Sequence, residues 1–234
     1  LMVVLTPADF DAALEQKVAV RERLRLIPGI GVDTERFDSA SVSDSDVAAL
    51  RSELRIAHDD PVVLTVARIA AGKCHDDMLR AVASLDRPVH TLLAGDGPLV
   101  DELKELADSL GIGDRVHFLG HRTDVPTLMK ASSVTVIASE REGLSRLVLE
   151  SMSMGVPIVG SDIRGVRELI GDDECGIVFQ VGDVKGLASA IEALMASPDL
   201  AAAKGSKGRL LVQEYDINKV LEAYESLFLQ VAAR

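Results

Sequence analysis

From Pro61 onward, short apolar runs alternate with longer amphipathic stretches. Five stretches with helical character separate the runs, and the clearest of them, PLVDELKELADSLGI, repeats leucine every three or four residues. Strands that are apolar throughout and alternate with such helices indicate a parallel sheet covered on both faces. Right-handed crossovers then predict an α/β fold, a doubly wound Rossmann-like domain over residues 56–215. The six strand-length runs are VVLTVA, HTLLAG, RVHFLG, VTVIAS, PIVGSD and GIVFQ.

The segments on either side of this domain follow other patterns. LMVVLT predicts a short strand, and Thr6, Pro7 and Asp9 resemble a helix start, with an N-cap hydroxyl, an early proline and an acid three residues after the cap. This helix is expected to end before IPGIGVD, whose proline and glycines break it. The polar run DSASVSDSD is expected to be a flexible connection or a helix entry, followed by a helix over about residues 47–54. Two further helices are expected in the tail, the last over about residues 217–232.

Composition narrows the class of protein. Of the 234 residues, 47% are hydrophobic and 26% charged, which is typical of a soluble globular chain. The net charge of −12 argues against a nucleic-acid partner, because phosphate backbones need a basic face. Two cysteines suggest no disulfide framework, and no residue spacing suggests a metal site. Without a membrane-length apolar run or a visible signal peptide, the expected location is cytoplasmic.

Cations gather in the loops that follow the predicted strands. In a doubly wound sheet, ligands bind beyond the carboxyl ends of the strands, so these loops are the informative ones. A local group of cations in a chain of net charge −12 suggests an anionic ligand. Arg68 and Lys73 offer a guanidinium and an ammonium that could bind a diphosphate within one loop. The alternative is two solvated loop cations, which this pair taken alone favours. The cations in these loops are Arg68, Lys73, Arg122, Arg141, Arg146 and Arg164.

The stretch SEREGLSRLVLESMSMGVPIVGSD predicts a strand end, a loop, a helix and a strand. A helix that starts near residues 143–145 offers free N–H groups to an anion, and Gly143 allows a ligand close to the backbone. Glu142 then lies in the loop and Glu150 within the helix. Glu150 has two interpretations: a ligand-binding carboxylate, or half of a surface ion pair with Arg146 four residues earlier. The residues alone favour the ion pair.

Other candidate motifs point to weaker alternatives. GDGP could begin a dinucleotide fingerprint, but Val100 occupies the place of the third glycine, so a tight turn with Pro98 opening the next helix is the better account. An NAD-linked oxidoreductase is therefore the least supported function. His75, His117 and His121 have no partner at motif spacing and are read as loop or strand-end residues. Neither a G-x-S-x-G nor a P-loop lysine motif is present.

Taken together, six ordered motifs resemble the C-terminal half of a family 4 retaining glycosyltransferase of GT-B architecture. They are IPGIGVDTERF, VARIAAGK, LLAGDGPL, DRVHFLGHRTDVPTLMKAS, SEREGLSRLVLESMSMGVPIVGSDIRGVRELI and CGIVFQVGD. The E-x7-E signature of that family corresponds to Glu142 and Glu150, and the wording around it is similar to bacterial enzymes that build capsule, exopolysaccharide or lipid-linked glycans.

The resemblance implies a role for each matching residue. Arg68 and Lys73 would bind the donor diphosphate and stabilise the leaving nucleotide, and with Glu142 they form the expected catalytic set. Glu150 would accept hydrogen bonds from the ribose, and the loop around Arg122 would hold the base, largely through its backbone. Glu142 would bind sugar hydroxyls, beside backbone N–H groups of Gly143, Leu144 and Ser145.

The resemblance also implies substrates and organisation. The donor would be a nucleotide-diphosphate sugar carrying a hexose or acetamido-hexose, UDP-linked rather than GDP-linked, with no cofactor and no metal. The acceptor would be a glycan or lipid-linked molecule, reached by a peripheral enzyme at the inner face of the membrane. Residues 1–30 would be a remnant of a missing N-terminal acceptor domain, 31–55 the connection, and 216–234 a helix that crosses back. A catalytically inactive nucleotide-sugar-binding remnant is the alternative.

Three positions depart from the pattern of that family. Ala67 and Cys74 stand where the family usually has glycine, and Ser151 stands where it usually has alanine. Ala67 adds a methyl group near the phosphates, whereas Cys74 removes the freedom of glycine to adopt a positive φ. We expect the first two to affect donor affinity and Ser151 to be mild.

Overall fold

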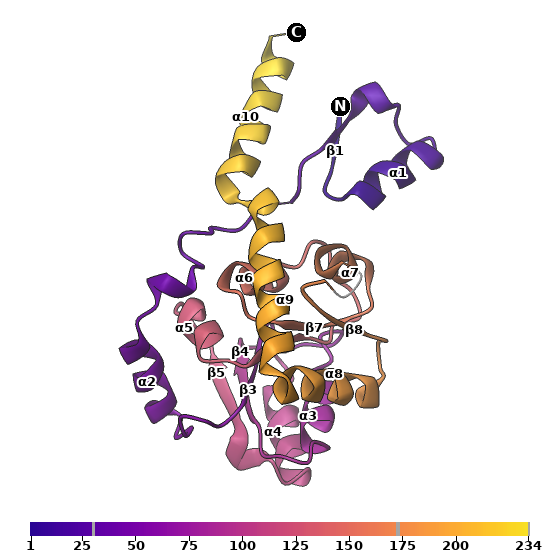
Figure 1. The fold of residues 1–234 in the computed structure, drawn as a ribbon. Coiled ribbons are helices and arrows are strands. Elements are labelled where there is room, and N and C mark those ends of the chain that lie inside the picture. The colour runs from indigo at the N-terminus through magenta and orange to yellow at the C-terminus, as the bar shows by residue number, and fades with distance from the viewer. Residues whose placement is uncertain (30, 172–173, 234) are drawn as a thin grey trace.

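The computed structural model describes residues 1–29, 31–171 and 174–233. Its centre is a sheet of six parallel strands in the order β5-β4-β3-β6-β7-β8 (Figure 1). Each of the six apolar runs predicted as a strand forms one, so the predicted doubly wound parallel sheet is confirmed. The strands are β3 (Val62–Val66), β4 (His90–Ala94), β5 (Val116–Gly120), β6 (Val134–Ile137), β7 (Ile158–Ser161) and β8 (Gly176–Phe179).

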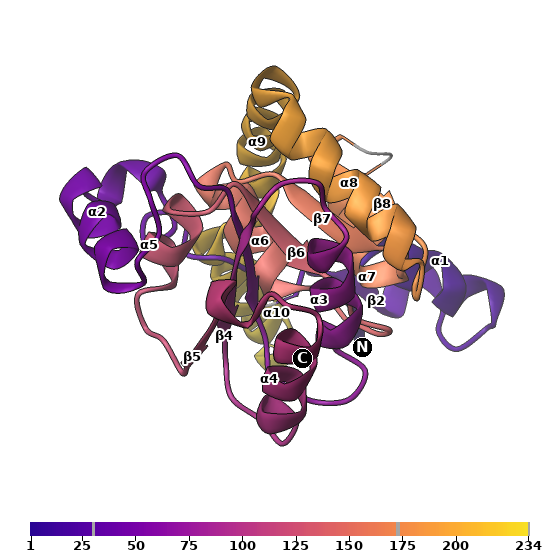
Figure 2. The ribbon, with the colours of Figure 1, turned by 90° about the horizontal axis from the view of Figure 1, so that it is seen from below.

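Helices cover both faces of this sheet because alternate strand residues point to opposite sides. Leu64 of β3 and Leu92 of β4 are register partners and share one apolar cluster with α5, α6 and α7. Val63 and Leu93 face the other way, into a cluster with α3, α4 and α8 (Figure 2). The helices are α3 (His75–Ala83), α4 (Val100–Ser109), α5 (Val125–Lys130), α6 (Arg146–Met154), α7 (Arg164–Ile170) and α8 (Val184–Ala196).

The strand order reverses direction between β3 and β6. The chain runs outward through β4 and β5, then returns to the centre and continues outward the other way through β7 and β8. The helices that follow β3 and β6 therefore leave toward opposite faces, which opens a crevice between the carboxyl ends of these two strands. In open α/β sheets this is the place where ligands bind.

Two glycines of the GDGP turn bring neighbouring loops together. A Cβ at Gly95 would lie 1.9 Å from the carbonyl oxygen of Ala67, and one at Gly97 would lie 2.0 Å from that of Ile69. Both glycines are thus required by close backbone packing between the loops after β3 and β4, as the tight-turn interpretation expects. One detail of that interpretation is wrong: α4 begins at Val100, two residues after Pro98.

The N-terminal residues form a separate small unit with one strand more than the sequence predicted. Thr6 caps α1 (Pro7–Glu15), as expected, by accepting a hydrogen bond from the backbone N–H of Asp9. However, α1 ends at Glu15, well before IPGIGVD, and a short 3₁₀ turn (Arg21–Arg23) leads into a second strand. This strand, β2 (Leu24–Leu26), pairs in parallel with β1 (Met2–Val4). Three residues with a central arginine were too short and too mixed to indicate a strand.

The connection to the large sheet contains more regular structure than its polar sequence suggested. A 3₁₀ turn (Ser39–Ser41) is followed by α2 (Asp44–Glu53), which begins three residues earlier than predicted. The hydroxyl of Ser43 caps this helix by accepting a hydrogen bond from the N–H of Asp46 at 3.1 Å. The polar run DSASVSDSD was expected to be a flexible connection or a helix entry, and the helix entry is correct.

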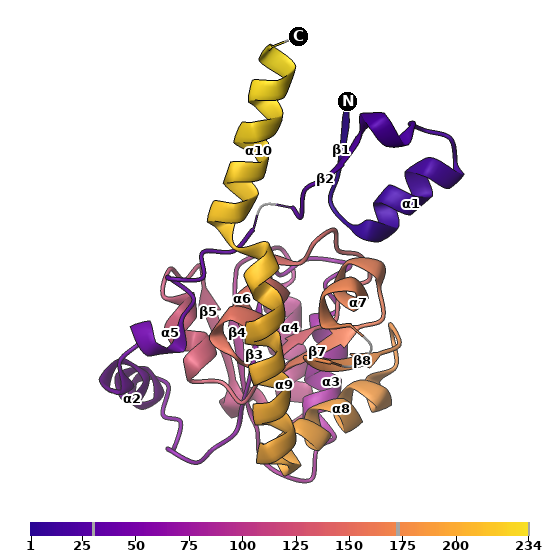
Figure 3. The same ribbon diagram turned by 45° about the horizontal axis from the view of Figure 1, so that its top comes forward.

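Three α-helices, rather than two, follow the last strand. After α8, helix α9 (Pro198–Leu211) packs outside α6, and a 3₁₀ turn (Val212–Tyr215) leads into α10 (Ile217–Ala232). Helix α10 has the bounds predicted for the last helix and extends away from the sheet beside the N-terminal unit (Figures 1 and 3). Val220 and Leu227 are buried there against Ile27, whereas the neighbouring Phe228 remains exposed.

The two chain segments that join the units run together. Val32 and Asp216 form a parallel β-bridge, and Thr34 donates a hydrogen bond of 2.5 Å to the carboxylate of Asp216. A Cβ at Gly31 would lie 2.8 Å from Cα of Ile217, so the crossing leaves no room for a side chain. Within the described part of the chain, no helix is long and apolar enough to span a bilayer.

Candidate functional site

A cavity of about 250 Å³ occupies the crevice between β3 and β6. Its floor is formed by the ends of these strands, residues 65–67 and 137–139, and its walls by Lys73, Glu142 and residues 144–147. The structure therefore brings Lys73, Glu142, Leu144 and Ser145, all predicted as site residues, to the switch point of the sheet.

Lys73 and Glu142 form an ion pair across this cavity. Nζ of Lys73 lies 2.5 Å from Oε1 of Glu142, and the two side chains are 28% and 20% exposed. The hydroxyl of Ser139 donates to the same carboxylate oxygen at 2.9 Å, and the hydroxyl of Ser161 donates to the carbonyl of Ser139 at 2.6 Å. The position of Glu142 is thus fixed by Ser139 in the loop after β6, which is in turn held by Ser161 at the end of β7.

This pairing has a chemical consequence for a ligand. In this structure the ammonium of Lys73 and the carboxylate of Glu142 neutralise each other. A ligand that carries both an anionic group and hydroxyl groups offers each of them a new partner, because the ammonium donates to anions and the carboxylate accepts from hydroxyls.

The loop that carries Glu142 is packed closely against α7. A Cβ at Gly165 would lie 1.5 Å from the carbonyl oxygen of Gly143 and 2.7 Å from that of Glu142. Gly143 itself faces open space, since a Cβ there would meet no described atom within 4 Å. The backbone at Gly143 is therefore accessible to a ligand, while Gly165 holds the loop in place.

Helix α6 starts at the edge of the cavity. Ser145 is its N-cap and is only 4% exposed, but its side chain makes no capping hydrogen bond. The N–H groups of the first turn, together with the positive end of the helix dipole, are then available to an anion. Arg146, the first residue of the helix, also lines the cavity and is 66% exposed. Arg146 was predicted both as one of the cations that suggest an anionic ligand and as a surface partner of Glu150, and its place beside the cavity agrees with the first of these.

Glu150 is buried, contrary to the surface position favoured by the residues alone. Its side chain is 12% exposed and accepts a hydrogen bond from Arg146 at 3.4 Å. Burial raises the pKa of this carboxyl group, and the nearby charges of Arg146 and Arg36 oppose the rise. The helix is buried on nearly every side, including Ser151. The four-residue spacing of Arg146 and Glu150 predicted their ion pair, but it could not show how deeply α6 is buried.

Arg36 is a site neighbour that sequence reasoning missed. It comes from the connection before α2, and its guanidinium donates to the carbonyl oxygen of Thr123 at 3.0 Å, in the loop after β5. Its charge also acts on Glu150. No local pattern could show this, because Glu150 lies 114 positions after Arg36 in the sequence.

We predict that Glu150→Gln makes the protein more stable at neutral pH. Because the folded-state pKa of Glu150 lies above its unfolded value, the wild type loses stability as the pH rises through the folded pKa, and the amide removes that loss. Thermal unfolding should show a higher Tm for the variant at pH 7 and no difference below about pH 4. A lower Tm at pH 7 would contradict this electrostatic account.

Arg68 and Arg122 lie outside the cavity. Arg68 is exposed and directly follows Ala67, which lines the cavity, and its guanidinium has no partner among the described residues. Arg122 donates two hydrogen bonds to Asp124, at 2.8 and 2.6 Å, and lies 3.7 Å from Glu53, contacts that raise its pKa. The guanidinium of Arg122 is therefore engaged, and the backbone of its loop is what remains for a ligand.

Cys74 adopts a positive φ, as expected at a position where glycine is usual. Its φ is 49°, in the left-handed region, at the N-cap of α3. A residue with a Cβ pays about 1–2 kcal/mol in this region. We predict that Cys74→Gly raises the free energy of unfolding by about 0.5–1 kcal/mol, after the greater entropy of glycine in the unfolded chain is subtracted. Urea denaturation measures this free energy. A lower value for the variant would show that packing of the thiol outweighs the backbone strain at residue 74.

None of the three candidate histidines lines the cavity. His75 is the first residue of α3 and is 4% exposed, and burial is the main cause that lowers its pKa to about 4. His117 lies near the start of β5, with its Nε2 3.0 Å from Nδ1 of His90, and His121 follows β5. In the described ranges, no group of three or more His, Cys, Asp or Glu residues is arranged to hold a metal ion.

Comparison with known proteins identifies the family. The family model for glycosyl transferases group 1 matches residues 46–211. The chain belongs to this family.

Two named relatives and one solved structure show the extent of the similarity. The lipopolysaccharide core biosynthesis glycosyltransferase LpsE of Rhizobium meliloti is 34% identical over 182 residues, 77% of this chain and 53% of that protein. The N-acetyl-alpha-D-glucosaminyl L-malate synthase of Bacillus anthracis is 30% identical over 189 residues, 80% of this chain and 50% of that protein. Anabaena Alr3699/HepE in complex with UDP-glucose is 27% identical, with a TM-score of 0.85, over 97% of this chain and 63% of that one. The chain thus spans about half the length of the relatives that it matches.

Proposed function

We propose that this chain is the donor-binding part of a retaining glycosyltransferase that uses a UDP-linked hexose or acetamido-hexose. The observation that carries the proposal is the cavity at the switch point, where Lys73, Glu142 and the start of α6 converge. The similarity to a protein solved with UDP-glucose supports UDP over GDP. Residues 56–215 would form the donor domain, and no cofactor or metal would take part.

In this proposal the donor diphosphate enters the cavity and separates the ion pair. Lys73 turns from Glu142 to the phosphate, and the N–H groups at the start of α6 bind it from the other side. Arg68, without a partner among the described residues, adds a second cation as the bond to the nucleotide breaks. The same cations bind more strongly as negative charge builds on the leaving diphosphate, so they favour the transition state.

Glu142 and Glu150 then bind different parts of the donor. Glu142, released by Lys73, accepts hydrogen bonds from sugar hydroxyls beside the accessible backbone of Gly143, Leu144 and Ser145. Glu150, whose charged form is favoured by the nearby charges of Arg146 and Arg36, accepts from the ribose hydroxyls. Backbone groups around Arg122 hold the base, with Arg36 fixing that loop through Thr123.

The chemical step transfers the sugar with retention. The bond from the anomeric carbon to the diphosphate oxygen breaks, and its electron pair stays on the diphosphate. The acceptor hydroxyl forms the new bond from the same face, through a short-lived ion pair, and gives its proton to the departing phosphate. The acceptor would be a glycan or lipid-linked molecule in polysaccharide biosynthesis, reached by a cytoplasmic protein at the inner face of the membrane.

The remaining segments would belong to the acceptor side of the enzyme. Residues 1–30 would contribute to an N-terminal acceptor domain, residues 31–55 would connect it, and residues 216–234 would cross back to it. The contact of α10 with the N-terminal unit and the pairing of Val32 with Asp216 support this division.

Calorimetric titration tests the proposal. UDP should bind the purified chain more tightly than GDP, and Arg68→Ala should weaken UDP binding about tenfold, the loss of one hydrogen bond to a charged group. Failure of both nucleotides to bind would overturn the proposal.

A second candidate is an inactive nucleotide-sugar-binding remnant. It is favoured by Cys74 at a positive φ and by Ala67 in the cavity floor. It predicts nucleotide binding without transfer even when an N-terminal domain is supplied by fusion, so turnover by such a fusion would reject it.

A further inference from the structure

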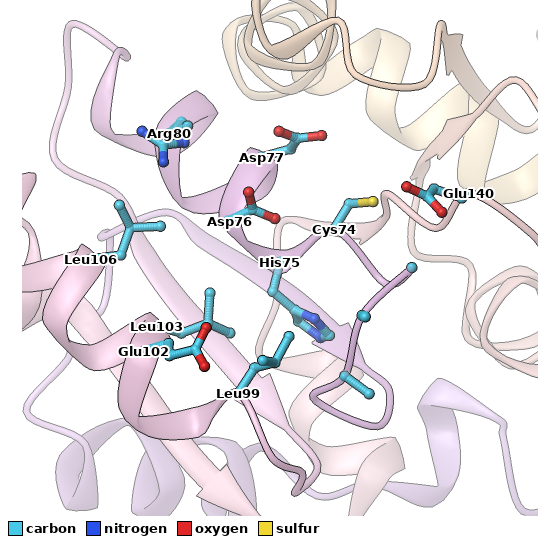
Figure 4. A pocket seen from close by; sticks show the side chains of 13 residues that line it. Cys74, His75, Asp76, Asp77, Arg80, Leu99, Glu102, Leu103, Leu106 and Glu140 are labelled. Carbon is cyan, nitrogen blue, oxygen red and sulfur yellow. The ribbon is translucent and has the colours of Figure 1, made fainter.

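A second, larger cavity lies between α3 and α4, on the other side of the loop that carries Lys73. Its volume is about 500 Å³, within the ~300–1,000 Å³ of small-molecule sites. Figure 4 shows the two helices facing each other across it, with acidic side chains at the rim and leucines of α4 below. No residue that lines the donor cavity also lines this one.

The rim of this cavity is negatively charged. Asp76 and Asp77 come from α3, Glu102 from α4 and Glu140 from the loop after β6, whereas Arg80 is the one cation among the lining residues. The surrounding carboxylates add to burial in raising the pKa of the Cys74 thiol, which also lines the cavity. An anionic ligand is disfavoured here, in contrast to the donor cavity.

A buried imidazole without a partner lines the same cavity. His75 is 4% exposed, and its ring makes no hydrogen bond with any residue that the structure describes. Its pKa, lowered to about 4 mainly by burial, keeps the ring neutral, so one ring nitrogen donates and the other accepts. The ring nitrogens are not among the fully enclosed polar atoms that lack a partner, so a ligand in the cavity can reach them and form a hydrogen bond.

The lining groups together match the chemistry of a sugar ring. Carboxylates accept hydrogen bonds from hydroxyl groups, and the N–H groups at the start of α3, whose N-cap makes no side-chain bond, can donate to them. The floor, made of Leu99, Leu103 and Leu106, offers an aliphatic surface to the C–H face of a pyranose.

The two cavities share a wall. Lys73 lines the donor cavity, and its neighbours Gly72 and Cys74 line the second one. On the facing loop, Ser139 and Glu142 belong to the donor cavity and Glu140 to the second, and the N–H of Glu140 donates to the carbonyl of Gly72 at 2.9 Å. An occupant of the second cavity therefore lies beside the donor without overlapping it.

We propose that the cavity between α3 and α4 is a subsite for a neutral or amine-bearing sugar residue of the acceptor glycan. This assignment to the acceptor rests on the proposed glycosyl transfer, whereas the sugar binding itself does not. The subsite selects against acidic sugars through the carboxylates of its rim.

NMR of the full chain with labelled leucine methyl groups tests this subsite. Maltose and glucosamine should shift the methyl signals of Leu99, Leu103 and Leu106, and glucuronic acid at equal concentration should not. The shifts should persist in saturating UDP, because the cavities are separate. Glu102→Lys should weaken maltose binding about tenfold while leaving UDP affinity unchanged, and Glu105→Lys, an equal charge change on α4 outside the cavity, should alter neither.

The possible failures separate the two proposals. The subsite is ruled out if none of the sugars shifts these methyl signals, if glucuronic acid acts as strongly as maltose, or if UDP abolishes the shifts. If the sugars bind but UDP does not, the sugar site stands and the proposed donor site falls.

Discussion

Lys73→Met is expected to weaken UDP binding about 10- to 100-fold, the loss of hydrogen bonds between a charged donor and the diphosphate. Methionine keeps most of the length of the lysine side chain and removes its charge, so packing around the loop should change little. The variant also leaves the carboxylate of Glu142 with Ser139 as its remaining hydrogen-bond partner among the described residues. Isothermal titration calorimetry with UDP measures the effect.

Lys130→Met provides a matched control. Lys130 is 26% exposed, close to the 28% of Lys73, and is paired at 2.8 Å with Asp44, away from the cavity. This second variant should bind UDP like the wild type. Equal affinities for UDP in the two variants would show that Lys73 has no special role in binding the diphosphate.

Gly165→Ala is expected to reduce both stability and UDP affinity. The added methyl group would lie 1.5 Å from the carbonyl of Gly143, so the loop that carries Glu142 must move away from α7. Overpacking of this kind costs about 1–3 kcal/mol of unfolding free energy, measurable by urea denaturation. UDP affinity should fall more than about tenfold, because the moved loop leads into the first turn of α6.

Gly143→Ala is the control for Gly165→Ala, because it adds a methyl group beside the proposed donor sugar without crowding the loop against α7. A Cβ at Gly143 meets no described atom within 4 Å, so this variant should keep the stability of the wild type. Its methyl group would instead stand where the donor sugar is proposed to lie, so UDP-glucose should bind more weakly while UDP itself is little affected. If Gly165→Ala is as stable as Gly143→Ala, the packing argument for Gly165 is wrong.

The regular core of the fold could be predicted because its pattern is local. Each apolar run from residue 62 to residue 179 formed a strand, and the leucine repeat placed α4 correctly. Where capping chemistry was explicit, as at Thr6, the helix start was also correct. The second strand of the N-terminal unit was missed because Leu24–Leu26 is stabilised by pairing with β1 rather than by its own pattern.

The candidate site was predictable only as a set of loops. The carboxyl ends of parallel strands had to share one edge, so Lys73 and Glu142 could be expected there, but their direct ion pair depends on side-chain geometry. The burial of Glu150 follows from the depth of α6 between the sheet and its neighbouring helices. The contribution of Arg36 arises from a connection far away in the sequence, which no local pattern reveals.

A crystal structure of the chain grown with UDP tests the central claim most directly. The account predicts UDP at the switch point between β3 and β6, with its phosphates within hydrogen-bond distance of Lys73 and of the first N–H groups of α6. The ribose should lie on Glu150, and the ion pair between Lys73 and Glu142 should be broken. UDP bound elsewhere, or bound at the switch point with that ion pair intact, would contradict the account.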